Sequence, residues 1–346
     1  MSGLLTSLES APQPMSELRC DPLLNRWVLI APARGSRPND FAAGSRVEQS
    51  APLCPFCEGN EHLTGPEQLA RRAEQTSPNG PGWTIRVIPN RYPAVTSEDE
   101  FSLFGETSAN TTTGWGRHEV IVETPRHLPL STTHSPDHWN EILQVFQERL
   151  RDFRRIPGLQ HAFVFKNHGP AAGASFIHPH CQIIALPRVP NAVADEIQAG
   201  DLWWRQTGHC PRCELVAAEI QDASRLVTAS SEIVAFCPHA SRFPYETWLL
   251  PRRHSSDFAS APPEVLNDLS SRLPAILVRL EQVIPGVSYN LVLHTAPLHA
   301  PALPGFHWRL EILPRLTGMA GFEWGSGWFI NQVAPERAAQ VLRPRD

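Results

Sequence analysis

Short apolar runs bounded by turn-forming residues predict a set of buried strands. Residues 162–165 and 183–186 are such runs, and a loop rich in Gly, Ala and Ser lies between them. Successive residues of a strand point to opposite faces of its sheet. We expect the second strand to include the residues just before 183, so that His178, His180 and Gln182 share one face. Three such polar groups in register are hard to explain as packing.

Two longer segments have the three- and four-residue apolar spacing of amphipathic helices. The first begins at Ser135, a good N-cap followed by Pro136, and ends near Phe153. The second begins near Pro263 and contains Pro274, where we expect a kink. The predicted core positions are Trp139, Ile142, Leu143, Phe146, Leu150 and Phe153 in the first, and Val265, Leu269, Leu273, Ile276, Leu280 and Val283 in the second.

The same motifs occur twice along the chain in the same order. A strand that ends in Pro-Arg-His at His127 has a counterpart that ends in Arg-Arg-His at His254. The helical segments at Pro136 and Pro263 are separated by the same interval as these two histidines. Motifs repeated at a constant offset predict a tandem duplication of one structural unit.

The repeat defines the expected fold class and domains. We predict an α+β protein in which antiparallel sheets carry helices packed on them. Residues 1–15 are expected to be a flexible extension, residues 16–190 a first unit with the catalytic site, and residues 191–346 a second, degenerate unit.

Composition narrows the function classes. The chain has 346 residues and a formal net charge of −5, which argues against a general nucleic-acid surface. Its basic residues are almost all Arg, and Lys166 is the only lysine. No apolar run is long enough for a membrane span, and the N-terminus does not resemble a signal peptide. We therefore expect a cytoplasmic protein whose cysteines bind metal or stay reduced.

The polar face around His180 suits phosphate chemistry. An imidazole can attack phosphorus and form a covalent intermediate, and a glutamine amide can bond to a phosphate oxygen where charge develops. The preceding Gly/Ser loop can bring backbone N–H groups close to an anion. His178-Pro179-His180-Cys181-Gln182 resembles the nucleotidyltransferase branch of the histidine triad superfamily. That branch includes the galactose-1-phosphate uridylyltransferases and the ADP-glucose phosphorylases. Its hydrolases usually have a third histidine where Gln182 stands.

The resemblance implies ping-pong nucleotidyl transfer, with His180 as the nucleophile and Gln182 stabilising the nucleotidyl-histidine. The favoured reaction transfers uridylyl from UDP-glucose to galactose 1-phosphate. ADP-glucose phosphorolysis is the alternative, and a triad-type nucleotide hydrolase the second alternative. A zinc-knuckle module that binds RNA or protein is a non-enzymatic alternative, which the acidic balance disfavours.

Two Cys-x-x-Cys pairs are candidate metal ligands, although one such pair alone could also be redox-active or structural. The repeat and the resemblance together imply two four-ligand zinc sites. The expected ligands are Cys54, Cys57, His127 and His178 in the first site, and Cys210, Cys213, His254 and His307 in the second. The zinc on His178 would hold the neighbouring nucleophile rigidly.

The second copy of the central face differs from the first. Arg309 and Glu311 stand where His180 and Gln182 stand in the first copy, and arginine cannot act as a nucleophile at ordinary pH. One catalytic centre per chain is therefore expected. Some uridylyltransferases carry iron in this half, and His294 resembles one ligand of that site, so iron is kept as an alternative to the second zinc.

The resemblance also implies substrate contacts and a homodimer. An arginine pair would bind phosphate, an asparagine ribose and base, a Gly/Ser loop the α-phosphate, and a Gly-Phe-Glu segment the hexose. The residues matching these roles are Arg34, Arg37, Asn90, Asn167, Gly173, Ser175, Phe322 and Glu323. Surface arginines and core aromatics are the alternative readings of Arg34, Arg37 and Phe322. The expected partners are a nucleotide sugar with a sugar 1-phosphate or phosphate, without nucleic acid or membrane.

Overall fold

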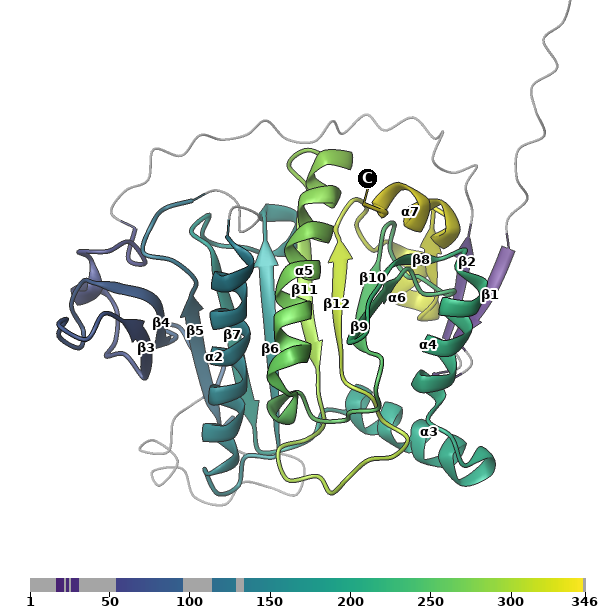
Figure 1. Cartoon of the computed structure of the whole chain (residues 1–346), viewed down its shortest axis with the longest axis horizontal. Coiled ribbons are helices and arrows are strands. Elements are labelled where there is room, and N and C mark those ends of the chain that lie inside the picture. Colours follow the sequence, from purple (N-terminus) through teal and green to yellow (C-terminus); the bar gives the residue numbers. More distant parts are fainter. Residues whose placement is uncertain are drawn as a thin grey trace, which may run out of the picture.

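The computed structural model describes residues 17–21, 23–24, 26–30, 54–95, 114–128 and 134–344. Within these residues the chain folds into a broad antiparallel sheet with helices packed on it (Figure 1). The fold class predicted from the sequence, a mixture of helices and antiparallel strands, is confirmed in this respect. The predicted site residues Arg34 and Arg37 lie outside the described residues.

Ten described strands form one antiparallel sheet in the order β3-β4-β5-β7-β6-β11-β12-β10-β9-β8. The two halves of the chain meet where β6 pairs with β11, and outward from this junction the strands follow the same order in both halves. The strands are β3 (Leu69–Arg72), β4 (Trp83–Pro89), β5 (Arg117–Val122), β6 (His161–His168), β7 (His180–Leu186), β8 (Leu226–Ala229), β9 (Ile233–Phe236), β10 (Thr247–Pro251), β11 (Tyr289–His294) and β12 (Arg309–Pro314).

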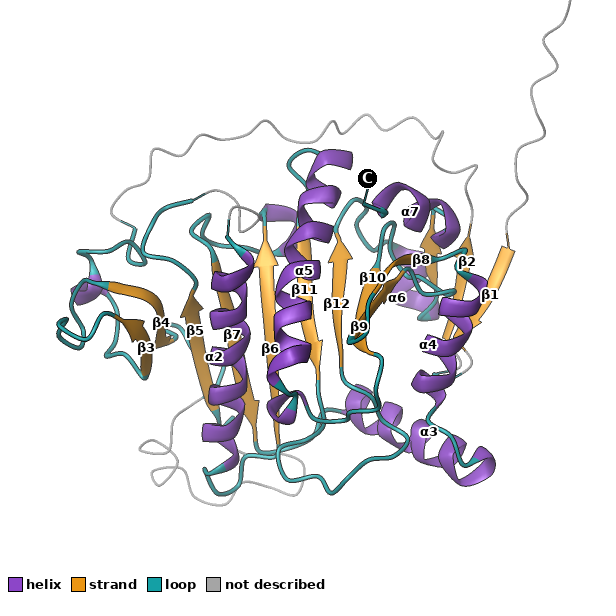
Figure 2. Cartoon of the chain, in the orientation of Figure 1, coloured by secondary structure: helices purple, strands orange, loops and turns teal. Residues whose placement is uncertain are grey.

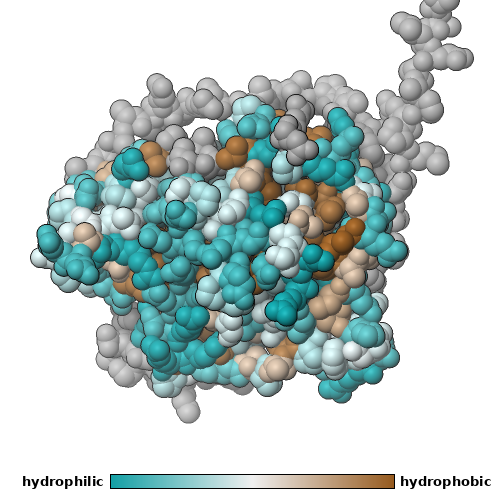
Figure 3. Space-filling model, in the orientation of Figure 1, coloured by the Kyte–Doolittle hydropathy of each residue, from teal (hydrophilic) through white to brown (hydrophobic). Residues whose placement is uncertain are grey.

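Helices α2 (Pro136–Arg154) and α5 (Pro263–Val283) lie side by side across one face of the sheet (Figure 2). Ser135 caps α2 by accepting a hydrogen bond from the backbone N–H of His138 at 3.2 Å. The predicted apolar stripes of both helices are buried, except that Val283 is only half-buried. Over these two helices the outer surface is mainly polar (Figure 3), as their amphipathic patterns predict.

The inward face of β7 joins the core beneath these helices. Cys181, Ile183 and Ala185 belong to the same buried cluster as the apolar residues of α2 and α5. Because strand residues alternate, His180 and Gln182 point to the opposite face of the sheet. Polar groups of β7 are thus presented on a face that these two helices do not cover.

The remaining elements lie toward the end of the sheet formed by β8–β10 (Figure 1). A smaller sheet joins β1 (Glu17–Asp21), β2 (Arg26–Ile30) and β13 (Phe329–Asn331) in the order β1-β2-β13. The N-terminal hairpin therefore bonds to the C-terminal region, although the predicted boundary at residue 190 assigns it to the first unit. The helices here are α3 (Asn191–Thr207), α4 (Pro211–Asp222), α6 (Gly321–Ser326) and α7 (Pro335–Leu342), and short 3-10 turns elsewhere are η2 (Glu61–Leu63), η4 (Pro170–Ala172) and η5 (Phe258–Ser260).

One local prediction is corrected. The sequence pattern placed His178 on the same strand face as His180 and Gln182, but β7 begins only at His180. His178 precedes the strand, and its side chain is fully buried against Cys54 and Cys57. Strand alternation therefore holds for His180 and Gln182 alone.

Among the described helices, none combines the length and the apolarity needed to cross a membrane.

Candidate active site and metal centres

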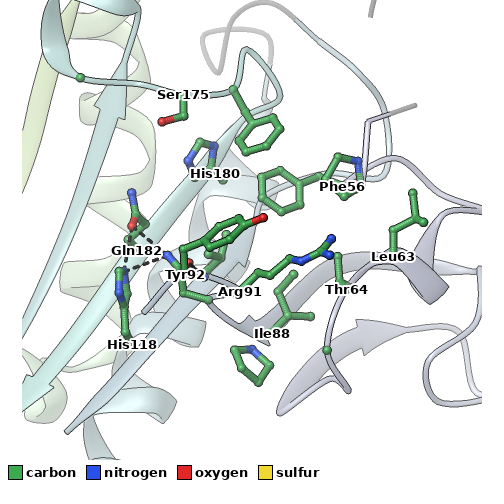
Figure 4. Close-up of a pocket in the computed structure, with 17 residues that line it drawn as sticks. Phe56, Leu63, Thr64, Ile88, Arg91, Tyr92, His118, Ser175, His180 and Gln182 are labelled. Atoms are coloured by element: carbon green, nitrogen blue, oxygen red, sulfur yellow. Dashed lines mark hydrogen bonds between the residues drawn. The ribbon is translucent and has the colours of Figure 1, made fainter. Parts of the chain in front are cut away.

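A cavity of about 600 Å³ lies on the face of the sheet opposite α2 and α5. Its floor is formed by alternate residues of β5 and β7, and its walls by the segments after β4 and after Cys54 (Figure 4). Among the sequence-predicted site residues, it brings together Asn90, Gly173, Ser175, His180 and Gln182. Polar groups on one side and apolar groups such as Phe56 and Ile88 on the other suit an amphipathic ligand.

His180 is held in one tautomer. Its Nδ1 lies 2.8 Å from the backbone carbonyl oxygen of His178, which can only accept a hydrogen bond, so Nδ1 carries the proton. Nε2 is then left with its lone pair. Burial lowers the pKa of the imidazole, which keeps it neutral. Phe56 packs on the ring with its centroid 5.4 Å away. The arrangement presents a neutral imidazole nitrogen to the cavity.

Gln182 lies in a hydrogen-bonded group with His118, on the neighbouring strand β5, and Asn90, which directly follows β4. His118 of β5 approaches Gln182 Oε1 with its Nε2 at 2.9 Å. The Nδ2 of Asn90 lies 3.5 Å from the same oxygen. These contacts are drawn as dashed lines in Figure 4. They fix the Gln182 side chain beside His180.

The loop before β7 turns back at Gly173. This residue has φ +82°, a left-handed conformation that favours glycine, at the end of η4. The turn brings Gly173 and the exposed Ser175 into the lining of the cavity. Ser175 lies on the His180 side (Figure 4). Gly173 and Ser175, which the sequence predicts to bind phosphate, therefore line the same cavity as His180.

A buried ion pair lies behind the nucleophile candidate. Lys166 of β6 is fully buried, and its ammonium group contacts the Glu123 carboxylate and donates to the backbone carbonyl of His180 at 3.2 Å. Burial alone would raise the pKa of Glu123, but the Lys166 ammonium and His134 outweigh it and hold that pKa well below its usual value. The only lysine of the chain therefore supports the start of β7.

The first predicted metal site is assembled. The ligand atoms of Cys54, Cys57, His127 and His178 all lie within 4.8 Å of one another. The Nδ1 of His178 is 3.7 Å from Cys54 Sγ and 3.6 Å from Cys57 Sγ. Metal–sulfur bonds of about 2.3 Å and metal–nitrogen bonds of about 2.1 Å at a tetrahedral angle require S–N separations of about 3.6 Å. These residues therefore fit a tetrahedral metal ion.

The second predicted site has the same geometry. Cys210, Cys213, His254 and His307 again place their ligand atoms within 4.8 Å of one another. Cys213 Sγ lies 3.6 Å from His254 Nδ1 and 3.5 Å from His307 Nδ1. In both sites the buried histidine directs Nε2 to a backbone carbonyl, of Thr124 for His178 and of Pro251 for His307. Such outer bonds orient a metal-binding imidazole.

In the described part of the second half, ion-paired side chains stand at the positions that correspond to His180 and Gln182. Arg309 and Glu311, the counterparts of His180 and Gln182, are both buried and bonded to each other at 2.7 Å. Arg309 also makes a two-pronged contact with Glu196 of α3, and Arg242 bonds to Glu311 at 2.6 Å. His294 lies 3.3 Å from Glu311 rather than in the four-ligand group. Buried ion pairs therefore occupy the positions on this face that correspond to His180 and Gln182.

Three predicted substrate contacts do not lie in the cavity of this chain. Asn167 is not in its lining, and its Oδ1 accepts from Asn290 Nδ2 at 2.8 Å. Phe322 and Glu323 lie on α6, at the other end of the sheet (Figure 1). There the Glu323 carboxylate caps its own helix by accepting from the Ala320 N–H at 2.9 Å. Glu323 thus has a local structural task in the single chain.

Sequence reasoning missed several residues that line the cavity. Phe56, His118 and Tyr92 all line it. His118 could have been suspected, because it alternates with Val120 on a predicted strand and is a polar residue on that face. Phe56 lies between Cys54 and Cys57, and nothing local in the sequence indicates that it packs on His180.

Comparisons with known proteins agree with this arrangement. Residues 9–190 match the family model for the N-terminal domain of galactose-1-phosphate uridyl transferase. The chain belongs to the galactose-1-phosphate uridylyltransferase family. Proteins of this family are nucleotidyltransferases, and this chain is an enzyme of that type.

Relatives within the family align over nearly the whole chain. An ADP-glucose phosphorylase of Arabidopsis thaliana is 35% identical over 341 residues, covering 97% of this chain and 94% of that protein. A galactose-1-phosphate uridylyltransferase of Thermotoga maritima is 28% identical, and the alignment covers 95% of this chain and 98% of that protein. The crystal structure of an Arabidopsis thaliana ADP-glucose phosphorylase with bound ADP-glucose has a TM-score of 0.82 at 34% identity and covers 96% of this chain and all of that one. A uridylyltransferase structure has a TM-score of 0.73 at 30% identity, and the match covers 95% of this chain and 98% of that one.

Proposed function

We propose that this enzyme transfers a nucleoside monophosphate by way of a covalent nucleotidyl-His180. The observation that carries the proposal is the tautomer of His180, whose protonated Nδ1 is bonded to the His178 carbonyl and whose Nε2 lone pair is available for attack. A nucleophile presented in this way needs no strong general base when the leaving group is a phosphate. Gln182 lies on the same strand face, one alternation further.

The reaction divides into two displacements. Nε2 of His180 attacks the α-phosphorus of a nucleoside diphosphate sugar, and the bond from that phosphorus to the bridging oxygen breaks. Sugar 1-phosphate leaves with that oxygen. An oxygen of the acceptor phosphate then attacks the same phosphorus, and the bond to Nε2 breaks. Gly173, Ser175 and the Gln182 amide would hold the oxygens of the transferred phosphoryl group.

The preferred donor is proposed to be ADP-glucose, with inorganic phosphate as acceptor and ADP and glucose 1-phosphate as products. The resemblance seen in the sequence favoured UDP-glucose as donor and galactose 1-phosphate as acceptor, and this pair remains the second candidate. The change is supported by the higher identity and TM-score of the ADP-glucose phosphorylases. It is also supported by Arg309 and Glu311, since ion pairs fill the region where His294 suggested iron.

The test is covalent labelling followed by an acceptor panel. Incubation with ADP-glucose or UDP-glucose labelled in the nucleoside, without acceptor, should leave label on the protein and release sugar 1-phosphate. Phosphate or galactose 1-phosphate should then remove the label. Absence of label with either donor would reject the mechanism. Faster labelling by UDP-glucose, discharged only by galactose 1-phosphate, would reject the ADP-glucose assignment. Nucleoside monophosphate released to water alone would indicate a hydrolase.

Both four-ligand groups are proposed to bind Zn²⁺, with iron in the second as the alternative. Zinc bound by Cys54, Cys57, His127 and His178 would hold the backbone of His178, whose carbonyl orients His180. Zinc bound by Cys210, Cys213, His254 and His307 would hold the second half, whose central face is filled by ion pairs. Only the metal bound at the first site would thus help to orient His180.

Matched ligand variants distinguish the two sites. Cys57→Ser and Cys213→Ser are each expected to halve the metal content, measured by elemental analysis of the purified protein. Cys57→Ser should also lower turnover by at least about tenfold, because His178 loses its anchor. Cys213→Ser should lower the melting temperature yet keep near wild-type turnover below that temperature. Equal losses of turnover in both variants would contradict a special role for the first site.

We infer that the chain arose by tandem duplication, with units at residues 16–190 and 191–346. The identical strand order in the two halves and the two equivalent four-ligand groups support this. A homodimer is also proposed, because Phe322 and Glu323 could contact a hexose only in the cavity of a neighbouring chain. Light scattering of the purified protein tests the dimer, and a monomer with full activity would exclude that role.

A further inference from the structure

We propose that His118 is a positioning residue that sets which end of the Gln182 amide faces the reacting phosphate. The inference rests on the proposed nucleotidyl transfer and names the group that prepares Gln182 for it. His118 lies on β5 and lines the cavity beside Gln182 (Figure 4). It does not itself supply the nucleophile or a metal ligand.

The tautomer of His118 is fixed from the loop after β4. The backbone N–H of Ala94 donates to His118 Nδ1 at 3.0 Å. Because a backbone N–H can only donate, Nδ1 carries no proton and the neutral ring carries its proton on Nε2. Burial lowers the pKa of His118, which favours this neutral form. The Nε2–H therefore donates to Gln182 Oε1 at 2.9 Å.

The amide of Asn90 is oriented by the same loop. Its Oδ1 accepts from the backbone N–H of Tyr92 at 2.9 Å, so its NH₂ group must point the other way. That group lies 3.5 Å from Gln182 Oε1 and 3.1 Å from His118 Nε2. Since His118 Nε2 is itself a donor, both donors are directed at Gln182 Oε1, and His118 is the nearer of the two.

The consequence concerns the other end of Gln182. A rotated amide would place its NH₂ group against two donors, which is unfavourable, so the NH₂ group is directed away from them. On this strand face the neighbouring group is His180. The Gln182 NH₂ group is therefore ready to donate to a phosphate oxygen, whereas the rotated amide would present a carbonyl oxygen to that anion.

The experiment measures the rate of covalent labelling of His180 in a double-mutant cycle. His118→Met keeps a similar size but removes the donor, and should slow labelling about tenfold with little change in the half-saturating donor concentration. His118→Gln keeps an amide donor and should retain most of the rate. In a Gln182→Met background, His118→Met should have no further effect, because no amide is left to orient.

A second variant, outside β5, controls for the possibility that His118→Met slows labelling by disturbing the strand. Ala94→Pro removes the exposed backbone N–H that fixes the tautomer, and should also slow labelling in the Gln182 protein but not in the Gln182→Met protein. Equal slowing in both backgrounds, or full rates in His118→Met, would overturn the positioning role. If the wild-type protein takes up no label from either nucleotide sugar, the proposed function itself fails. If the wild type is labelled but His118→Met slows labelling equally with and without Gln182, only the positioning role of His118 is rejected.

Discussion

Replacing His180 by alanine is expected to abolish nucleotidyl transfer, with kcat falling by about 10⁴-fold or more. The variant has no nitrogen at the position of Nε2. Among the described residues, His118 is the other imidazole that lines this cavity, and both of its ring nitrogens already have hydrogen-bond partners. The measurement is turnover together with incorporation of labelled nucleoside monophosphate into the protein.

The matched control for this variant is His299→Ala, since His299 is exposed and lies outside the cavity of the nucleophile. It should label and turn over like the wild type. Both variants should melt near the wild-type temperature, because His180 belongs to the cavity face rather than to the apolar core under α2. Turnover by His180→Ala at the wild-type rate would exclude a covalent intermediate on His180.

Replacing Lys166 by methionine is expected to destabilise the fold by about 3–5 kcal/mol, because it leaves the Glu123 carboxylate buried without its partner. Neither side chain has more than 1% of its surface exposed. The measurement is the midpoint and slope of urea unfolding. The double variant Lys166→Met, Glu123→Gln should recover part of the loss, since no charge then remains unpaired.

The loss of stability caused by Lys166→Met should increase with pH. In the wild type the pKa of Glu123 is held well below that of the unfolded chain, so its contribution is present above the unfolded pKa and lost only in strong acid. Without Lys166, burial raises that pKa, and the folded variant is favoured by protonation. The difference between wild type and Lys166→Met should therefore be larger at pH 8 than at pH 5.

The surface pair of Arg155 and Asp152 provides the comparison. Arg155 is 79% exposed, and Arg155→Met should change the unfolding midpoint little, since exposed ion pairs are weak. A similarly small effect of Lys166→Met would show that Glu123 finds other partners in the folded protein. His134 and Cys181, which also contact this carboxylate, are the groups that could supply them.

The sequence by itself determined the two helices that cover the sheet, α2 and α5, the strands β6 and β7, and some of the residues that line the cavity. Ser135 and the apolar stripe after it are local signals, and α2 follows them within a residue. Strand alternation is local as well, so it placed His180 and Gln182 on one face correctly. The repeat, together with the family resemblance, indicated two ligand sets, and in each set the structure brings the ligand atoms within 4.8 Å of one another.

Only the tertiary structure decided how distant strands lie beside one another. The contact of His118 with Gln182 depends on the pairing of β5 with β7, and the partner of Lys166 lies on the segment after β5. The ion pairs that fill the second face depend on Glu196 arriving from α3. The physical reason is that propensity and alternation act over a few residues, whereas register and side-chain pairing depend on the packing of the whole sheet.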